Sequence, residues 1–231
     1  MKNFAFIFAR GGSKGLPGKN IRLLAGKPLL KYSIDTAQAS PSISQVFVST
    51  DDPSIAEVAK AAGATVIERP SELATDTSPE WLAWRHAIEW AIVHYGQFEG
   101  FVSLPATSPL RSIDDVEGAL AKLHECDADI CISVTPANRS PYFNMVKATT
   151  DGLVELVNKP DAELTRRQDA PQVFDITTVV YATNPEFVLK HYGIFSGKVT
   201  SIVVPKERAV DIDDIYDFKL AEAIIGSITD E

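Results

Sequence analysis

The chain has 231 residues, of which 45% are hydrophobic and 23% are charged. These values are typical of a globular protein and exclude disordered, collagen-like and coiled-coil chains. The length suits one α/β domain, alone or with an arm, which buries enough surface to need no disulfide or structural metal. The net charge of −9 argues against general binding to nucleic acid or to anionic membranes, since both are negatively charged.

The cysteines and histidines give no sign of a metal site. Cys126 and Cys131 do not form a CxxC pair, and the four histidines lack the spacing of metal ligands. No apolar run approaches the roughly 20 residues of a membrane helix, and the run 4–9 is too short for the apolar region of a signal peptide. The sequence therefore predicts a cytoplasmic protein with reduced thiols.

Short apolar runs alternate with helix-length amphipathic segments through the first 135 residues. The expected strands cover 4–9, 46–49, 65–67, 101–104 and 130–134, and the expected helices cover 31–39, 54–62, 79–95 and 113–124. This order is typical of parallel strands joined by covering helices, so we expect an α/β fold with a mostly parallel sheet flanked by helices.

The alternation breaks between residues 137 and 198. Pro141, Pro160, Pro171 and Pro185 separate short strand-like segments there, such as 142–148 and 176–182. A strand at 199–204 and a helix at 215–225 then resume the pattern. We therefore expect one domain over 1–231 with an inserted arm at 137–198, which serves as a dimer contact and as a lid over an acceptor.

A glycine-rich basic loop follows the first strand. Residues 10–20 contain four glycines, three cations and one proline. Glycines let backbone N–H groups approach an anion, and open α/β sheets bind ligands at the carboxyl ends of their strands. Arg10 and Lys19 are therefore expected to face phosphate groups, although the GxxxxGK[ST] and GxGxxG patterns are both absent. The alternative is a solvated basic turn.

Two aspartates near the other end of the chain form the second candidate group. Asp211 and Asp213 follow the strand at 199–204, and alternation is expected to place their side chains on one side. Two carboxylates in an oxygen-rich site suit Mg²⁺, which also takes water and substrate phosphates as ligands. Capping of the last helix is the alternative role for Asp213 or Asp214.

Two further motifs lie where expected strands end. The segment 49–53 suits an N-cap at Asp52 with Pro53 in the first turn of a helix, or a contact with a nucleotide. The segment 104–111 brings the hydroxyl groups of Thr107 and Ser108, and the guanidinium of Arg111, to the same edge of the sheet. Hydroxyl caps of the next helix are the alternative for this segment.

Together these motifs resemble the acylneuraminate cytidylyltransferases, the CMP-sialic acid synthetases. The segments that carry the resemblance occur in the family's order over nearly the whole chain, at 9–20, 49–51, 69–70, 73–77, 107–111 and 211–213. The resemblance implies a single-domain, Rossmann-like nucleotidyltransferase fold that is usually dimeric. It also implies transfer of CMP from CTP to the anomeric hydroxyl of a keto-sugar acid of the sialic acid type, with Mg²⁺ or Mn²⁺ and with release of pyrophosphate.

The resemblance assigns roles to individual residues. It places Arg10 and Lys19 on the triphosphate, with Asp211 and Asp213 holding the metal, and these four residues are the expected catalytic group. The nucleotide contacts that it implies are Gly11, Gly12, Ser13, Asn20, Arg69, Asp76, Thr77 and Ser78. The acceptor contacts that it implies are Thr107, Ser108, Arg166, Arg167, Gln168 and Tyr181.

The chain departs from the sialic acid members in the acceptor half. Pro105 stands where those members carry a glutamine, and 175–178 replaces an Arg-Pro-Asn-Gly run before Tyr181. The sugar acid is therefore open among sialic, legionaminic, pseudaminic and octulosonic acids. The expected partners are CTP, this sugar acid and a second copy of the chain. The alternatives are a sugar-1-phosphate nucleotidyltransferase, a nucleotide-sugar glycosyltransferase and a non-catalytic nucleotide-binding module.

Overall fold

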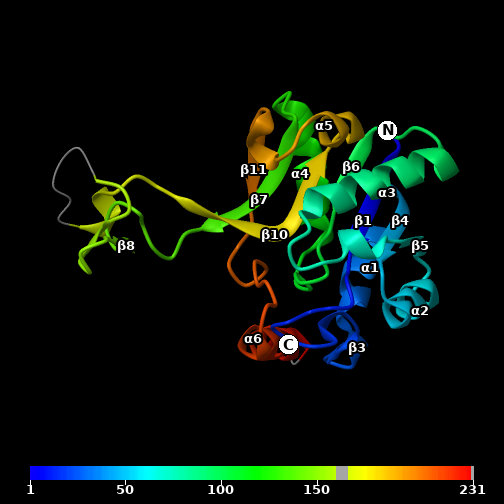
Figure 1. The fold of residues 1–231 in the computed structure, drawn as a ribbon, viewed down its shortest axis with the longest axis horizontal. Coiled ribbons are helices and arrows are strands. Elements are labelled where there is room, and N and C mark those ends of the chain that lie inside the picture. The colour runs from blue at the N-terminus through cyan, green and yellow to red at the C-terminus, as the bar shows by residue number, and fades with distance from the viewer. Residues whose placement is uncertain (160–165, 230–231) are drawn as a thin grey trace.

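The computed structural model describes residues 1–159 and 166–229. Over this part of the chain, seven strands form one sheet in the order β11-β7-β10-β6-β1-β4-β5 (Figure 1). The strands are β1 (Asn3–Phe8), β4 (Ile43–Thr50), β5 (Thr65–Glu68), β6 (Gly100–Ser103), β7 (Ile130–Pro136), β10 (Phe174–Thr183) and β11 (Val199–Val203).

Most neighbouring strands of the sheet are parallel. β1 pairs in parallel with β4 and β6, β4 with β5, and β7 with β11, whereas β10 runs antiparallel to β6 and β7. The mostly parallel α/β sheet predicted from the sequence is confirmed. The carboxyl ends of β1, β4, β5 and β6 consequently meet at one edge, which is where an open α/β sheet binds its ligands.

Helices cover both faces of the sheet. α1 (Leu29–Ala39), α2 (Pro53–Ala61) and α4 (Ile113–Glu125) pack on an aliphatic face, and α3 (Glu80–Tyr95) and α5 (Pro185–Lys190) pack on an aromatic one. Strand alternation creates the two faces, since Ala5 and Ile7 of β1 point to the first and Phe4 and Phe6 to the second. None of the helices in the described ranges is long and apolar enough to cross a membrane.

Side-chain caps at the starts of several helices hold strand-to-helix loops in place. Asp52 accepts hydrogen bonds from the backbone N–H groups of Ser54 and Ile55, which confirms the predicted cap of α2. α4 begins with a capping box between Ser112 and Asp115. At α6 (Ile215–Thr229), Asp214 caps the helix, so capping accounts for one of the three neighbouring aspartates.

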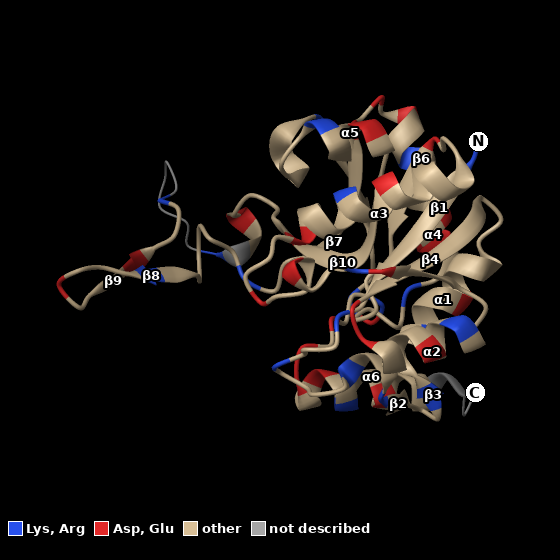
Figure 2. Cartoon of the chain, turned by 45° about the vertical axis from the view of Figure 1, so that its right-hand side comes forward, with Lys and Arg blue, Asp and Glu red and all other residues tan. Residues whose placement is uncertain are grey.

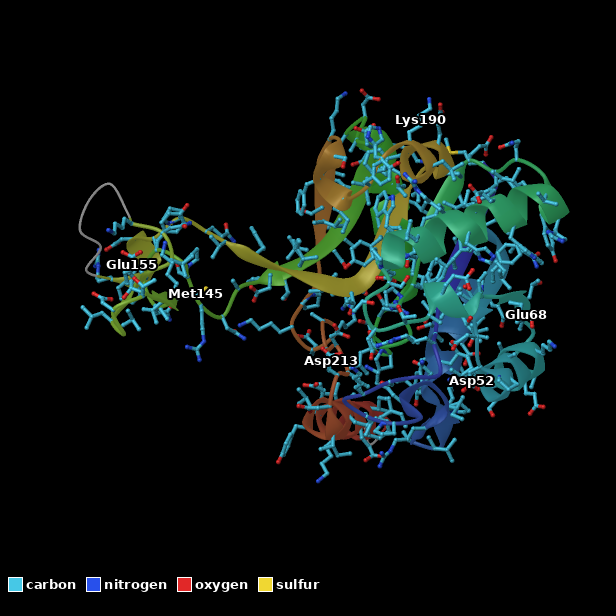
Figure 3. All side chains as sticks on the ribbon, viewed as in Figure 1. Asp52, Glu68, Met145, Glu155, Lys190 and Asp213 are labelled. Carbon is cyan, nitrogen blue, oxygen red and sulfur yellow. The ribbon has the colours of Figure 1, made fainter. Side chains whose placement is uncertain are left out.

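The arm is shorter than the range 137–198 expected from the sequence. It carries the hairpin of β8 (Val146–Ala148) and β9 (Val154–Leu156), which projects away from the sheet (Figures 1 and 3). The second half of the expected range belongs to the body, because β10 lies between β6 and β7 and α5 packs on the aromatic face. Pro185 does not end an element there. It is the first residue of α5, which the Asn184 side chain caps.

The segment before α6 is a loop, so the expectation of alternating aspartates at the end of a strand is wrong. β11 ends at Val203, and Pro205 has no N–H group with which to continue a ladder. The loop is fixed instead by the Arg208–Asp115 ion pair at 2.9 Å and by the Ile212 N–H, which donates to the Thr107 carbonyl at 2.9 Å. Burial opposes ionisation of Asp115, but the hydrogen bonds from Arg208 and Ser112 outweigh it and lower the pKa of Asp115.

Candidate active site

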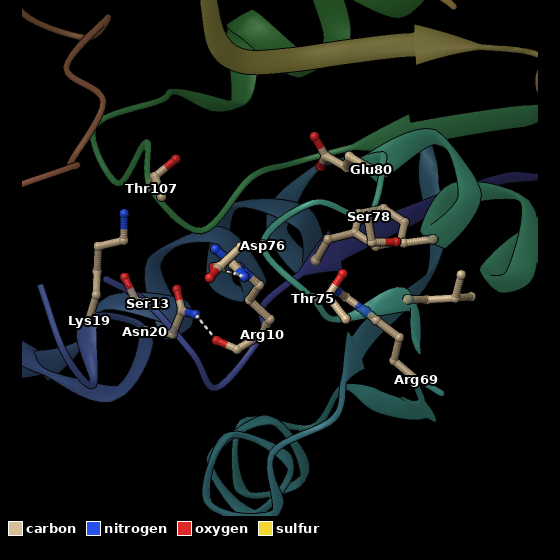
Figure 4. A pocket seen from close by; sticks show the side chains of 13 residues that line it. Arg10, Ser13, Lys19, Asn20, Arg69, Thr75, Asp76, Ser78, Glu80 and Thr107 are labelled. Carbon is tan, nitrogen blue, oxygen red and sulfur yellow. Dashed lines mark hydrogen bonds and ion pairs between the residues drawn. The ribbon is translucent and has the colours of Figure 1, made fainter. Parts of the chain in front are cut away.

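A cavity of about 290 Å³ lies at the edge where the parallel strands end (Figure 4). Loops that are far apart in the sequence form its walls, and several predicted residues line it: Arg10, Ser13, Lys19, Asn20, Arg69, Asp76, Ser78 and Thr107. A second hollow beside α2 is lined by Asp51, Asp52, Glu57 and Glu68, with Lys60 beside them. Those carboxylates would repel a triphosphate, so the first cavity is the candidate site.

The basic loop is held against the loop that precedes α6. Lys19 is only 8% exposed; its Nζ donates to the Ile212 carbonyl at 2.5 Å and lies 3.5 Å from Asp213 Oδ1. A Cβ atom at Gly15 would collide with the Asp213 carbonyl oxygen, so glycine permits this close approach. The structure thus brings together the basic and acidic groups that lie near opposite ends of the sequence.

Arg10 and Lys14 form the second cationic group of the cavity mouth. Both bind Asp76, with Arg10 Nη1 at 2.6 Å from Oδ1 and Lys14 Nζ at 2.5 Å from Oδ2. The hydrogen bonds from Lys14 and Arg10 lower the pKa of Asp76. The Asp76 carboxylate thus holds two cations at a position where an incoming anion would compete for them. Figure 2 shows basic and acidic residues close together in the loops between the sheet and α6.

Asp211 and Asp213 fit the donor set of a divalent cation. Burial raises the pKa of Asp211, the charge of Asp213 adds to the increase, and the nearby hydroxyls of Thr107 and Thr178 oppose it. Within the described ranges, Asp211 Oδ1 is buried without a hydrogen-bond partner, whereas the Asp213 side chain is 81% exposed. An orphaned carboxylate oxygen beside a second carboxylate suits Mg²⁺. The described side chains form no cluster of three potential ligands, so phosphate or water oxygens would complete the coordination.

The opposite end of the cavity is built on Arg69. Its Nε donates to Ser49 Oγ at 3.1 Å and its Nη2 to the Ser49 carbonyl at 2.7 Å, which fixes the guanidinium over the Phe8 ring. Ser78 lines this end as well. Three predicted nucleotide contacts are not among the residues that line the cavity. The Gly11 N–H donates to Asp51 Oδ1 at 3.1 Å, and Gly12 and Thr77 are exposed.

The residues expected to contact the acceptor are divided between the body and the arm. Thr107 lines the cavity, whereas Ser108 is fully buried and shares a 2.6 Å hydrogen bond with Thr178. Tyr181 packs against Trp84, and burial raises the pKa of Tyr181 to about 12. Arg166 binds Asp169 at 3.0 and 3.1 Å, and Gln168 is exposed beside it on the arm. The side chain of Arg167 lies outside the described part of the chain.

The sequence places Arg111 at the edge of the sheet with Thr107 and Ser108, and the structure shows it buried as a support for this loop. It is 5% exposed, and its guanidinium donates to the carbonyls of Val179, Pro105 and Thr178 and to Ser33 Oγ. Burial lowers the pKa of Arg111 to about 9, which leaves it charged at neutral pH. These bonds join the loop after β6 to β10 at the point where the register of β10 shifts.

Glu80 is a residue of the cavity that no sequence motif indicated. It lines the cavity from the first turn of α3, and its Oε1 accepts a hydrogen bond from Trp84 Nε1 at 3.3 Å. Desolvation by the surrounding protein raises the pKa of Glu80, against the effects of Trp84 and Arg69. In sequence, a glutamate after Pro79 reads as an ordinary first-turn acid that favours the helix dipole, so no pattern distinguished it.

Replacing Arg111 by methionine is expected to lower the free energy of unfolding by about 3 kcal/mol or more, because the variant leaves buried carbonyls without donors. Chemical denaturation of the variant and the wild type measures the difference. Arg139→Met, at an exposed position of the arm, is the control and should stay within about 0.5 kcal/mol of wild type. Equal stability of the two variants would contradict the supporting role of Arg111.

Known proteins resemble this chain over nearly its whole length. A family model described as "Cytidylyltransferase" matches residues 4–202. The "CMP-N,N'-diacetyllegionaminic acid synthase" of Campylobacter jejuni is 34% identical over 222 residues, which cover 95% of this chain and 93% of that protein. The "Post-translational flagellin modification protein B" of Campylobacter coli is 33% identical over 221 residues, which cover 95% of this chain and 93% of that protein.

A solved structure shares the fold. CMP:2-keto-3-deoxy-manno-octonic acid synthetase, determined in complex with CTP, superimposes with a TM-score of 0.73 over 99% of this chain and 100% of that one. The sequence identity is 16%, so this likeness speaks for the architecture alone. It agrees with the sheet order and helix layers described above.

Proposed function

The chain belongs to the cytidylyltransferase family, among the CMP synthetases of the sialic acid type, and from this premise we propose that it transfers CMP from CTP to a keto-sugar acid. The acceptor is the anomeric hydroxyl of the sugar acid, and pyrophosphate is released. The observation that carries the proposal is the contact of Lys19 with Ile212 and Asp213, which unites a cationic loop and a carboxylate pair at one cavity.

The charges of the cavity orient the nucleotide. Lys19 and Arg10 lie on the side that suits the triphosphate, with Asn20 holding the Arg10 carbonyl through a 3.0 Å hydrogen bond. Gly11, Gly12 and Ser13 belong to the same loop as Arg10. Arg69 and Ser78 lie on the side that suits the base and the ribose, whereas Asp76 faces Arg10. The nucleotide therefore spans the cavity with its phosphates toward the carboxylate pair.

Asp211 and Asp213 would hold Mg²⁺ or Mn²⁺. The buried, unpartnered Oδ1 of Asp211 and the exposed carboxylate of Asp213 supply two of its oxygen ligands. When bound, such a cation neutralises phosphate charge and favours loss of the proton from the attacking hydroxyl.

Positioning and charge neutralisation are the main tasks of the protein in this reaction. The anomeric hydroxyl oxygen forms a bond to the α-phosphorus of CTP. In line with it, the bond breaks between the α-phosphorus and the oxygen that bridges the α- and β-phosphates. Lys19 and Arg10 stabilise the charge that grows on the departing pyrophosphate. Arg10 must first exchange the Asp76 carboxylate for a phosphate oxygen, so binding of the nucleotide rearranges the mouth of the cavity.

Arg10→Ala and Asp211→Ala are each expected to lower kcat by about 10²–10³-fold, since each removes a contact that strengthens in the transition state. The assay is pyrophosphate release from CTP and Mg²⁺ with a panel of keto-sugar acids. Lys60→Ala and Asp114→Asn change exposed charges away from the cavity and serve as controls. Near-wild-type turnover of either active-site variant at saturating CTP and Mg²⁺ would refute its assignment.

We further propose that the arm contacts a second copy of the chain and covers its acceptor site. The hairpin exposes Val146, Leu153 and Val154 at 58%, 65% and 64%, and clustered apolar exposure of this kind marks interaction surfaces. An isolated two-stranded hairpin is only marginally stable in water, which also favours a partner. Because Arg166 lies on the arm, its guanidinium would reach an acceptor carboxylate in the other copy.

Light scattering at micromolar concentration is expected to give twice the mass of one chain for the wild type. Val154→Asp should shift the mass toward that of a monomer, because it places a charge in the apolar contact. Thr150→Asp changes an exposed residue of the same hairpin turn and should remain dimeric. A monomeric wild type at this concentration would rule out the dimer.

A further inference from the structure

We propose that Glu80 selects cytosine over uracil by accepting a hydrogen bond from the exocyclic amino group of the base. The inference rests on the proposed function to the extent that it takes the cavity as the nucleotide site. It adds a specificity-determining residue that neither the basic loop nor the carboxylate pair supplies.

Glu80 lies across the cavity from the residues expected to bind the phosphates. Figure 4 shows the Glu80 carboxyl group on the far side of the cavity from Lys19, with Ser78 and Arg69 below it. Lys19 and Arg10 define where the phosphates bind. A nucleotide that extends from these cations therefore places its base toward Glu80.

The walls near Glu80 suit a flat, partly apolar ring. Phe8, Leu73 and Ala83 line the cavity together with Glu80. The centroids of the Phe8 and Trp84 rings are 6.3 Å apart, and Trp84 belongs to the buried aromatic core. A rigid apolar wall with a few polar groups is the usual form of a site that orients a small planar ligand.

Glu80 is held as an acceptor at this end of the cavity. Trp84 Nε1 donates to Oε1 at 3.3 Å, and Trp84 is itself packed between Trp81, Phe101 and Tyr181. Desolvation raises the pKa of Glu80 and the charge of Asp211 adds to the increase, whereas the Trp84 hydrogen bond and the charge of Arg69 oppose it. The side chain therefore presents an oxygen acceptor from a fixed position.

Arg69 and Glu80 together match the polar edge of cytosine. A guanidinium donates to acceptors such as O2 and N3, and a carboxylate accepts from the amino group at C4. Uracil carries a carbonyl oxygen at C4, so its O4 would face the Glu80 carboxylate with two acceptors and no proton between them. The site then rejects uracil because O4 and the carboxylate oxygen face each other without a hydrogen bond, not because it lacks room.

The test measures nucleotide binding alone, by isothermal titration of CTP and UTP with Mg²⁺ and no acceptor. The wild type is expected to bind CTP more tightly than UTP. Glu80→Gln keeps the volume and an oxygen for Trp84, and its amide can turn an NH₂ group toward O4. It is therefore expected to reduce the CTP-to-UTP affinity ratio by about tenfold to a hundredfold, the range of one base-reading contact.

Two further variants separate this role from a general effect on folding. Glu80→Asp retains a carboxylate and is expected to keep CTP preferred over UTP. Glu89→Gln changes an exposed glutamate of the same helix and is expected to leave the ratio unchanged. Thermal unfolding of each variant checks that the fold is intact.

An unchanged CTP-to-UTP ratio in folded Glu80→Gln would overturn the proposal. So would a variant that alters only the KM of the sugar acid in the turnover assay, because Glu80 would then face the acceptor beside Tyr181 and Asp211. Binding requires no acceptor, so failure to form any CMP-sugar would refute the proposed function while leaving a shifted ratio as support for Glu80.

Discussion

The contact of Lys19 with the Ile212–Asp213 segment is the interaction on which the candidate site depends. It joins residues separated by 193 positions in the chain, and it puts a nearly buried ammonium group beside a carboxylate. A small apolar cluster lies beneath it, in which Leu16 of the basic loop packs with Ile212 and with Phe218 of α6. Burial of these side chains supplies the attraction that brings two loops of opposite charge to one cavity.

Hydrogen bonds between buried polar groups fix the backbone on the acceptor side of the cavity. Ser133 Oγ accepts from the Val180 N–H at 3.0 Å and from Thr177 Oγ1 at 2.8 Å, and Arg111 holds the adjacent carbonyls. Each of these groups would be costly to bury unpaired, so the network specifies one backbone path through the register shift of β10. The Arg208–Asp115 pair performs the same task for the loop that carries Asp211.

Local periodicity made much of the fold predictable. The strands of the seven-stranded sheet and the α-helices through residue 135 begin and end within a few residues of their expected positions, because alternation and helical spacing are local signals. The place of β10 was not predictable in this way, since antiparallel pairing with β6 and β7 depends on contacts between distant segments. Pro205 ended β11 before the aspartates, and the expected alternation of Asp211 and Asp213 failed for that reason.

The candidate site was predictable where a residue's chemistry is unusual for its context. Glycines and cations in an acidic chain singled out the loop at 10–20, and paired aspartates singled out 211–213. Glu80 carried no such signal, because it reads as a helix-start acid. The motif at 104–111 indicated the place of Arg111 at the edge of the sheet, but not its burial within a network of hydrogen bonds. Their surroundings in the fold, a cavity wall and a fully enclosed network, give them their importance.

A crystal soaked with CTP and Mn²⁺ tests the central claim most directly, through the anomalous signal of the metal. We predict a peak between the carboxylates of Asp211 and Asp213 and the phosphates, with Lys19 on the triphosphate and Arg10 released from Asp76. A nucleotide whose phosphates lie away from Lys19, or a metal peak remote from both aspartates, would contradict the account.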